Sequence, residues 1–131
     1  MKQYMQPKWW LIGVGAIFTI FTLLTYAGIV NAAETGWGPD YTPNDAFYEK
    51  AWAATYLIIA IICLVSGQFV EGRAQAILAI TIGGGNILIF ILTFLAAGDL
   101  EYGYTDSPAN WAIPMICATG LLVSGYLHLE D

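Results

Sequence analysis

Residues 74–98 read AQAILAITIGGGNILIFILTFLAAG, and this stretch decides the fold. It contains no Asp, Glu, Lys, Arg or His, and its apolar residues show no two-residue alternation. A helix rises about 1.5 Å per residue, so about 20 apolar residues cross the hydrocarbon core of a bilayer. Backbone polar groups must be paired within the segment in hydrocarbon, and the alternation of a barrel strand is missing. The stretch therefore predicts a transmembrane helix.

Three further stretches have the same character. They cover residues 9–33, 51–70 and 107–129, and only His128 interrupts the last of them. Because 58% of all residues are hydrophobic and 11% are charged, little of the chain is left for a soluble domain. The sequence predicts an all-α polytopic membrane protein whose four transmembrane helices form an antiparallel bundle.

We expect a single domain over residues 1–131. Its spans are placed approximately at residues 9–31, 43–70, 74–97 and 108–129, with outer loops at 32–42 and 98–107. Small residues after the first span are typical of a signal-peptidase site, but its apolar run exceeds the roughly 7 to 15 residues of a signal peptide. We therefore predict that the first span is retained.

The distribution of charge predicts an orientation. Lys2, Lys8 and Arg73 fall on one side of the bundle together with both termini, and only Lys50 falls on the other. Basic residues in short loops mark the cytoplasmic side, so we expect cytoplasmic termini in a prokaryotic inner or plasma membrane. The opposite, outer surface carries most of the acids, at Glu34, Asp40, Asp45, Glu49, Asp99, Glu101 and Asp106.

The two halves of the chain resemble each other and are interpreted as two tandem helical hairpins. Residues 64–67 and 122–125 both read LVSG, and residues 16–28 can be laid over 86–98. Pro43 and Pro108 each follow a hydroxyl residue, which is typical of a helix start. Leu64 comes 21 residues after Pro43, whereas Leu122 comes 14 residues after Pro108. The second span should therefore be about seven residues longer than the fourth.

Cys63 and Cys117 lie inside the second and fourth spans. Measured from the shared LVSG motif they differ by four residues, or about 6 Å of depth at the helical rise. Adding a helix spacing of about 8 to 10 Å exceeds the separation that a disulfide allows. We predict two free, buried thiols.

Residues 83–86 read GGGN near the middle of the third span. The first interpretation of Gly83, Gly84, Gly85 and Asn86 is close helix packing, with the amide hydrogen-bonded across the contact. The alternative is an unwound segment that lines a ligand pocket. Pro114 should bend the fourth span. This bend has the same two interpretations, as a feature of helix packing or as part of a ligand pocket.

Asp45 and Glu49 lie four residues apart on one helical face, and oxygen-rich clusters bind hard cations. No EF-hand spacing is present, and exposed acids are usually solvated, so we assign no metal and keep these two as weak candidates. His128 is the only histidine, which excludes bis-histidine haem ligation within one chain. The sequence contains no nucleotide-binding glycine loop, no Cys-x-x-Cys pair and no basic patch for nucleic acid. It implies no cofactor, and we expect no catalytic residues.

Three functional hypotheses remain open. The first is a small non-catalytic subunit that packs against larger partners, or against copies of itself, in a multi-subunit membrane complex. The second is a four-helix carrier or binding protein for a lipid, a quinone or a small permeant. The third is an enzyme subunit that shares a metal or redox centre with a partner. Membrane lipids, other integral subunits or a homo-oligomer are the expected partners, and nucleic acid is not.

Overall fold

A computed structural model describes residues 2–100 and 102–131, and all of its regular elements are helical. In chain order the elements are α1 (Pro7–Tyr26), α2 (Ala32–Trp37), α3 (Pro43–Phe69), α4 (Gly72–Leu100), the 3-10 turn η1 (Gly103–Thr105) and α5 (Pro108–Leu127). Among these, α1, α3, α4 and α5 are long and apolar enough to cross a membrane. The structure thus confirms the predicted all-α chain with four membrane-length helices, as expected of an integral membrane protein.

The helices begin where local chemistry favours it. Proline occupies the first turn of α1, α3 and α5, where its missing N–H would have no partner. The Thr42 side chain accepts from the Asp45 backbone, and Asp45 accepts from Thr42 in return, which completes a capping box. α3 is 27 residues long and α5 is 20, so the predicted seven-residue difference is confirmed.

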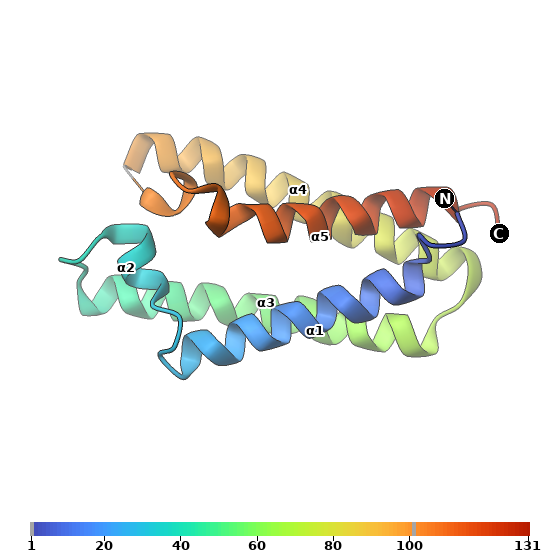
Figure 1. The fold of residues 1–131 in the computed structure, drawn as a ribbon, viewed down its shortest axis with the longest axis horizontal. Helices are drawn as coiled ribbons and strands as arrows, with labels where there is room; N and C mark the ends of the chain where they lie inside the picture. The colour runs from blue at the N-terminus through green and yellow to red at the C-terminus, as the bar shows by residue number, and fades with distance from the viewer. Residues whose placement is uncertain (1, 101) are drawn as a thin grey trace.

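The long helices pair as two antiparallel hairpins. α1 packs along α3, and α4 packs along α5, whereas α3 and α4 share few contacts although a short turn joins them. Figure 1 shows the hairpins lying one above the other, with both termini beside the α3–α4 turn. We call this the terminal end. The opposite end, which carries α2 and η1, is called the loop end.

In each hairpin the two helices come closest to each other at glycine residues. A Cβ on Gly67 would lie 3.2 Å from the Lys8 carbonyl oxygen, and a Cβ on Gly125 would lie 2.5 Å from that of Ala76. At Gly125 the approach excludes a side chain, whereas at Gly67 a Cβ would require the Lys8 backbone to shift by a few tenths of an ångström. The LVSG glycines therefore fix the contact between the two helices of each hairpin.

The same contacts recur at constant offsets in both hairpins. A Cβ on Gly15 would meet the Ala60 carbonyl oxygen, and one on Gly83 would meet that of Ala118. Equivalent positions in α1 and α4, the first helices of the two hairpins, are 68 residues apart: 8 corresponds to 76, and 15 to 83. Equivalent positions in α3 and α5, the second helices, are 58 residues apart: 60 corresponds to 118, and 67 to 125. The hairpins thus repeat each other, but the alignment of residues 16–28 with 86–98 was wrong by two residues, because low-complexity apolar sequences match in several registers.

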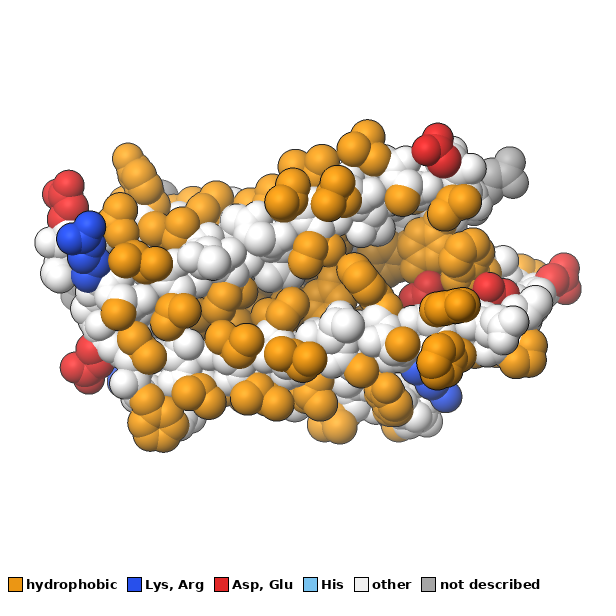
Figure 2. Space-filling view, turned by 180° about the vertical axis from the view of Figure 1, so that it is seen from behind, with side chains coloured by type: hydrophobic (Ala, Val, Ile, Leu, Met, Phe, Trp, Pro, Cys, Tyr) orange, Lys and Arg blue, Asp and Glu red, His pale blue; other side chains and the backbone are white. Residues whose placement is uncertain are grey.

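The distribution of apolar and charged side chains is that of a protein embedded in a membrane. Leu11, Cys63 and Leu121 are fully buried, while large aliphatic and aromatic side chains are exposed along all four long helices. Figure 2 shows these apolar side chains along the length of the molecule, with charged groups near its two ends. Cys63 and Cys117 are both buried and free, which confirms the prediction of two unpaired thiols.

Three predicted boundaries need correction. The first long helix ends at Tyr26 rather than near residue 31, because Gly28 adopts φ +73° and turns the chain. The predicted loop 32–42 contains the helix α2, which starts where Asn31 accepts a hydrogen bond from the Glu34 backbone. α4 continues to Leu100 and so includes the first three residues of the loop predicted at 98–107, because Gly98 and Asp99 do not interrupt its backbone hydrogen bonding.

Candidate functional site

A large cavity separates the two hairpins near the loop end. Its volume is about 860 Å³, and its walls come from all four long helices, from α2 and from the segment around η1. The space exists because α3 and α4 diverge while α1 remains packed on α3 and α5 on α4. Figure 2 shows the molecule hollowed between its two halves toward the loop end, with hydrophobic side chains inside the hollow. The cavity is therefore open on one flank of the bundle.

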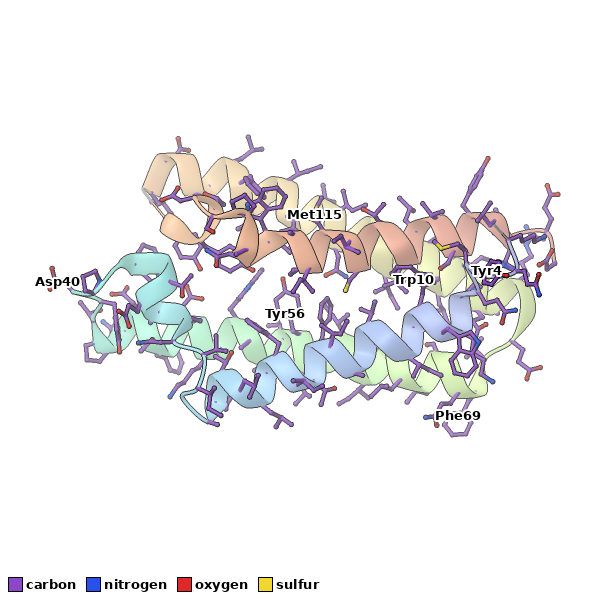
Figure 3. All side chains as sticks on the ribbon, in the orientation of Figure 1. Tyr4, Trp10, Asp40, Tyr56, Phe69 and Met115 are labelled. Atoms are coloured by element: carbon purple, nitrogen blue, oxygen red, sulfur yellow. The ribbon has the colours of Figure 1, made fainter. Side chains whose placement is uncertain are left out.

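The cavity wall is mainly apolar and aromatic. Figure 3 shows Tyr56 between the two hairpins, where it contacts the edge of Phe18 at a ring separation of 5.0 Å and that of Trp52 at 5.7 Å. The aromatic side chains that line the cavity are Phe18, Phe21, Trp37, Tyr48, Trp52, Tyr56, Phe90, Tyr102 and Tyr104. Rings of this kind offer both apolar area and, for Tyr and Trp, a polar tip.

Glu49 is the one charged residue among the described residues that line this cavity. It lies in the second turn of α3 and is only 9% exposed. Its Oε1 accepts a hydrogen bond of 3.1 Å from Trp37 Nε1 and another of 2.7 Å from the Tyr102 hydroxyl. The first donor comes from α2 and the second from the segment before η1, so this carboxylate ties together three parts of the loop end.

Tyr102 covers Glu49 at the loop end of the cavity, and we call Tyr102 and Tyr104 together the roof. The ring of Tyr102 lies 4.9 Å from that of Trp37, and a Cβ on Gly36 would lie 2.3 Å from its Cε2. A side chain at position 36 would therefore displace the Tyr102 ring from its place against α2. Burial, followed by the hydrogen bond to Glu49, raises the pKa of Tyr102, so the hydroxyl stays protonated and remains a donor at neutral pH.

Tyr104 continues the roof toward α5. It stacks on Tyr102 at a ring separation of 6.0 Å. Its hydroxyl donates to the Asn110 carbonyl at 2.7 Å, and the Asn110 amide donates back to the Tyr104 carbonyl at 3.0 Å. Burial, with a smaller contribution from the charge of Glu49, raises the pKa of Tyr104. The second hairpin is thereby joined to the roof.

The GGGN segment lies away from this cavity, and of the predicted pocket residues only Pro114 lines it. α4 runs unbroken through residues 83–86. Gly83 faces α5, whereas a Cβ on Gly85 would meet nothing within 4 Å. The Asn86 amide nitrogen donates to the Ile82 carbonyl at 2.8 Å, and its Oδ1 is buried without a partner. These contacts fit the packing interpretation of Gly83 and leave Gly85 facing outward. The expected hydrogen bond of Asn86 across the helix contact was wrong, because its amide donates within α4, to the carbonyl one turn before it.

The two weak metal candidates have separate partners. Asp45 Oδ2 accepts from the backbone and the hydroxyl of Thr42, both at 2.7 Å, while Glu49 accepts from Trp37 and Tyr102. Within residues 2–100 and 102–131, no three His, Cys, Asp or Glu side chains gather as a metal site would require. A carboxylate in a helix cap and a carboxylate in the cavity therefore serve different local roles.

His128 lies at the terminal end, far along the bundle from the cavity. Its Nδ1 is 2.6 Å from Asp131 Oδ2, and its Nε2 is 3.1 Å from the Lys2 carbonyl oxygen. The Lys2 ammonium also pairs with Asp131. These contacts join the N-terminal segment to the end of α5.

The set formed by Glu49, Trp37 and Tyr102 was not expected from the sequence. Trp37 and Tyr102 belong to loops whose aromatic residues are also explained by the headgroup layer of a membrane. The one feature of the sequence that pointed to this set was the acid at residue 49, because it lies within a predicted span, in the part by which the second span is longer than the fourth. Its two donors are 12 and 53 residues away in the chain, a separation at which sequence periodicity carries no information.

Comparison of the chain with models of known families, with curated proteins and with solved structures found no match. Its function must therefore be inferred from its own geometry.

Proposed function

We propose that this integral membrane protein binds an apolar or amphiphilic small molecule in the cavity between its hairpins. The observation that carries the proposal is the cavity itself, whose volume of about 860 Å³ lies within the roughly 300 to 1,000 Å³ of ligand pockets. An apolar, aromatic wall with a few polar groups is also typical of such pockets. This is the carrier or binding-protein hypothesis of the sequence analysis.

The flank on which the cavity opens supports entry of the ligand from the membrane. The hollow lies between α3 and α4 (Figure 2), two helices that are apolar enough to cross a bilayer. Exposed apolar residues line it, among them Trp52 on α3 and Leu100 on α4. A molecule dissolved in lipid would reach the cavity without crossing water.

The test is to fill the cavity and measure binding of a neutral apolar probe. Ala97 lines the cavity and is 5% exposed, whereas Leu95 on the same helix is 67% exposed and does not line it. In nanodiscs, N-phenyl-1-naphthylamine should show saturable energy transfer from tryptophan in the wild type and in L95W, but not in A97W. Circular dichroism and thermal unfolding would establish that A97W is folded. Equal saturable transfer in all three proteins would contradict the proposal.

A second candidate function is that of a subunit in a multi-subunit membrane complex, alone or with copies of itself. It is favoured by Gly85, which is exposed on α4 with open space beside it and would let a partner helix approach closely. Migration of the native protein from its own membrane as a lone small particle on a native gel would count against it. A shift to smaller size in G85L, with G98L as the control glycine that also meets nothing within 4 Å, would support it.

We further propose that the terminal end faces the cytoplasm of a prokaryotic cell. Lys2, Lys8 and Arg73 lie at that end, and an excess of basic residues marks the cytoplasmic side. The cavity would then lie in the outer half of the membrane.

A further inference from the structure

We infer that the ligand of the cavity is a lipophilic cation, for which Glu49 is the counter-charge. This inference rests on the proposed function and adds the charge of the ligand to it.

The first argument is the unbalanced charge of the cavity. Glu49 is 9% exposed, and its two hydrogen-bond donors, Trp37 and Tyr102, are neutral groups. The salt bridges within residues 2–100 and 102–131 lie at the terminal end, at Asp131. A buried carboxylate is costly unless it takes up a proton or a positive charge accompanies it. A cationic ligand would supply that charge.

The second argument is the aromatic wall around the carboxylate. Trp52 and Tyr56 line the cavity from α3, and Tyr102 and Tyr104 line it from the loop end. The face of an aromatic ring attracts a cation within about 6 Å, most strongly for Trp and when water is excluded. Quaternary ammonium groups are bound by such rings. One carboxylate beside several rings is therefore a suitable environment for a large, weakly hydrated cation.

The third argument is the exclusion of other ligand classes. No Lys, Arg or His is among the described residues that line the cavity, so a carboxylate or phosphate headgroup would meet only the negative charge of Glu49. A neutral ligand would leave that charge uncompensated. Further acids lie at the loop end, among them Glu34, Asp40 and Asp99, and acids gathered at one surface raise the local concentration of cations.

The experiment compares two ions of the same shape and opposite charge. Tetraphenylphosphonium and tetraphenylborate would be titrated against the full-length protein in nanodiscs of uncharged lipid, with empty nanodiscs as the blank. We expect saturable calorimetric binding of the phosphonium and only the blank signal for the borate.

The variant E49Q removes the charge and keeps the shape. The Gln carbonyl oxygen can still accept from Trp37 and Tyr102, so the roof should remain folded. We expect phosphonium affinity to fall roughly tenfold or more, because one unit of charge is lost beside the ligand. The matched control is D99N, since Asp99 is an exposed acid of the same end that does not line the cavity; its affinity should stay within about twofold of the wild type.

The outcomes separate the two proposals. Equal affinity for both ions, or unchanged phosphonium affinity in folded E49Q, would overturn the cation assignment while saturable binding of N-phenyl-1-naphthylamine keeps the binding function. Failure of all three probes to bind the wild type would remove both. If E49Q does not fold, W52L replaces it, because Trp52 is 44% exposed on the cavity wall. A selective loss of phosphonium binding relative to the neutral probe is then expected, and equal retention of both would overturn the assignment.

Discussion

Gly67 and Gly125 occupy equivalent positions in the two hairpins, each pressed against the backbone of the preceding long helix. A Cβ at residue 67 would lie 3.2 Å from the Lys8 carbonyl oxygen, and one at residue 125 would lie 2.5 Å from that of Ala76. The tighter contact belongs to the hairpin of α4 and α5. Because both glycines belong to the same LVSG motif, the repeat in sequence is also a repeat in packing.

The first prediction concerns Gly83, whose added Cβ would lie 2.6 Å from both the Ala118 carbonyl oxygen and the Leu122 nitrogen. G83A should lower the free energy of unfolding by about 1–3 kcal/mol, because the clash is with backbone that cannot move aside. Thermal unfolding in detergent would measure it.

The matched control is G85A, two residues further along α4. A Cβ there would meet nothing within 4 Å, and Ala is favoured over Gly in a helix by up to about 1 kcal/mol. G85A should therefore unfold at the same temperature as the wild type or slightly higher. A G83A protein as stable as G85A would refute the close approach of α4 and α5.

The second prediction concerns the hydroxyl of Tyr102. Y102F keeps the ring over Gly36 and Trp37 but removes the 2.7 Å hydrogen bond to Glu49, which should cost about 1–3 kcal/mol of stability. Y126F is the control, because Tyr126 is 73% exposed near the terminal end. Unfolding at neutral pH should distinguish the two variants.

The pH dependence of this effect has a definite sign. The pKa of Tyr102 is raised by burial and by its bond to Glu49, above the ordinary value of 10.0. A raised pKa gives stability that is fully present below the ordinary value and is lost as the pH rises through the folded-state pKa. The wild type should therefore lose more stability than Y102F above about pH 10. Parallel loss in both proteins would contradict the assignment.

The third prediction concerns the terminal end. Hydrogen bonds from Lys2 and then His128 lower the pKa of Asp131 below its ordinary value of 3.8. A lowered pKa gives stability that is present above the ordinary value and is lost as the pH falls through the folded-state pKa. D131N should unfold at a lower temperature than the wild type at pH 7, and the difference should be smaller at an acidic pH below 3.8.

E130Q is the control for this comparison, because Glu130 is an exposed neighbour of the same charge. Its unfolding temperature should match that of the wild type at both pH values. A difference between D131N and the wild type that persists unchanged in acid would show that the side chain acts through something other than its charge.

The fourth prediction is the orientation in the membrane. Cys63 and Cys117 are buried, so the wild type should react little with a membrane-impermeant maleimide. S107C at the loop end should be labelled in intact cells, and E71C at the terminal end only after the cells are opened. Both residues are exposed. The reverse pattern would invert the proposed topology.

The sequence by itself determined the number of long helices, their approximate limits and the segregation of charge to two ends. These properties are local: an uncharged apolar stretch requires a helix in hydrocarbon wherever its neighbours lie, and Pro43 and Pro108 mark helix starts through their own missing N–H. The seven-residue difference between α3 and α5 follows from counting alone. The helix α2 escaped prediction because Gly36 and Gly38 indicate a turn, and only the contact of Gly36 with Tyr102 explains the glycine at position 36.

The tertiary structure decided which helices pair, and therefore where space is left. α3 and α4 are neighbours in the chain, yet α3 packs on α1 and α4 on α5, because glycines at the LVSG positions permit close approach only within each hairpin. The cavity that results brings Trp37 and Tyr102 to Glu49 across 12 and 53 residues of chain. Hydropathy reports the solvent of each segment separately, whereas a cavity is a property of how segments fit together.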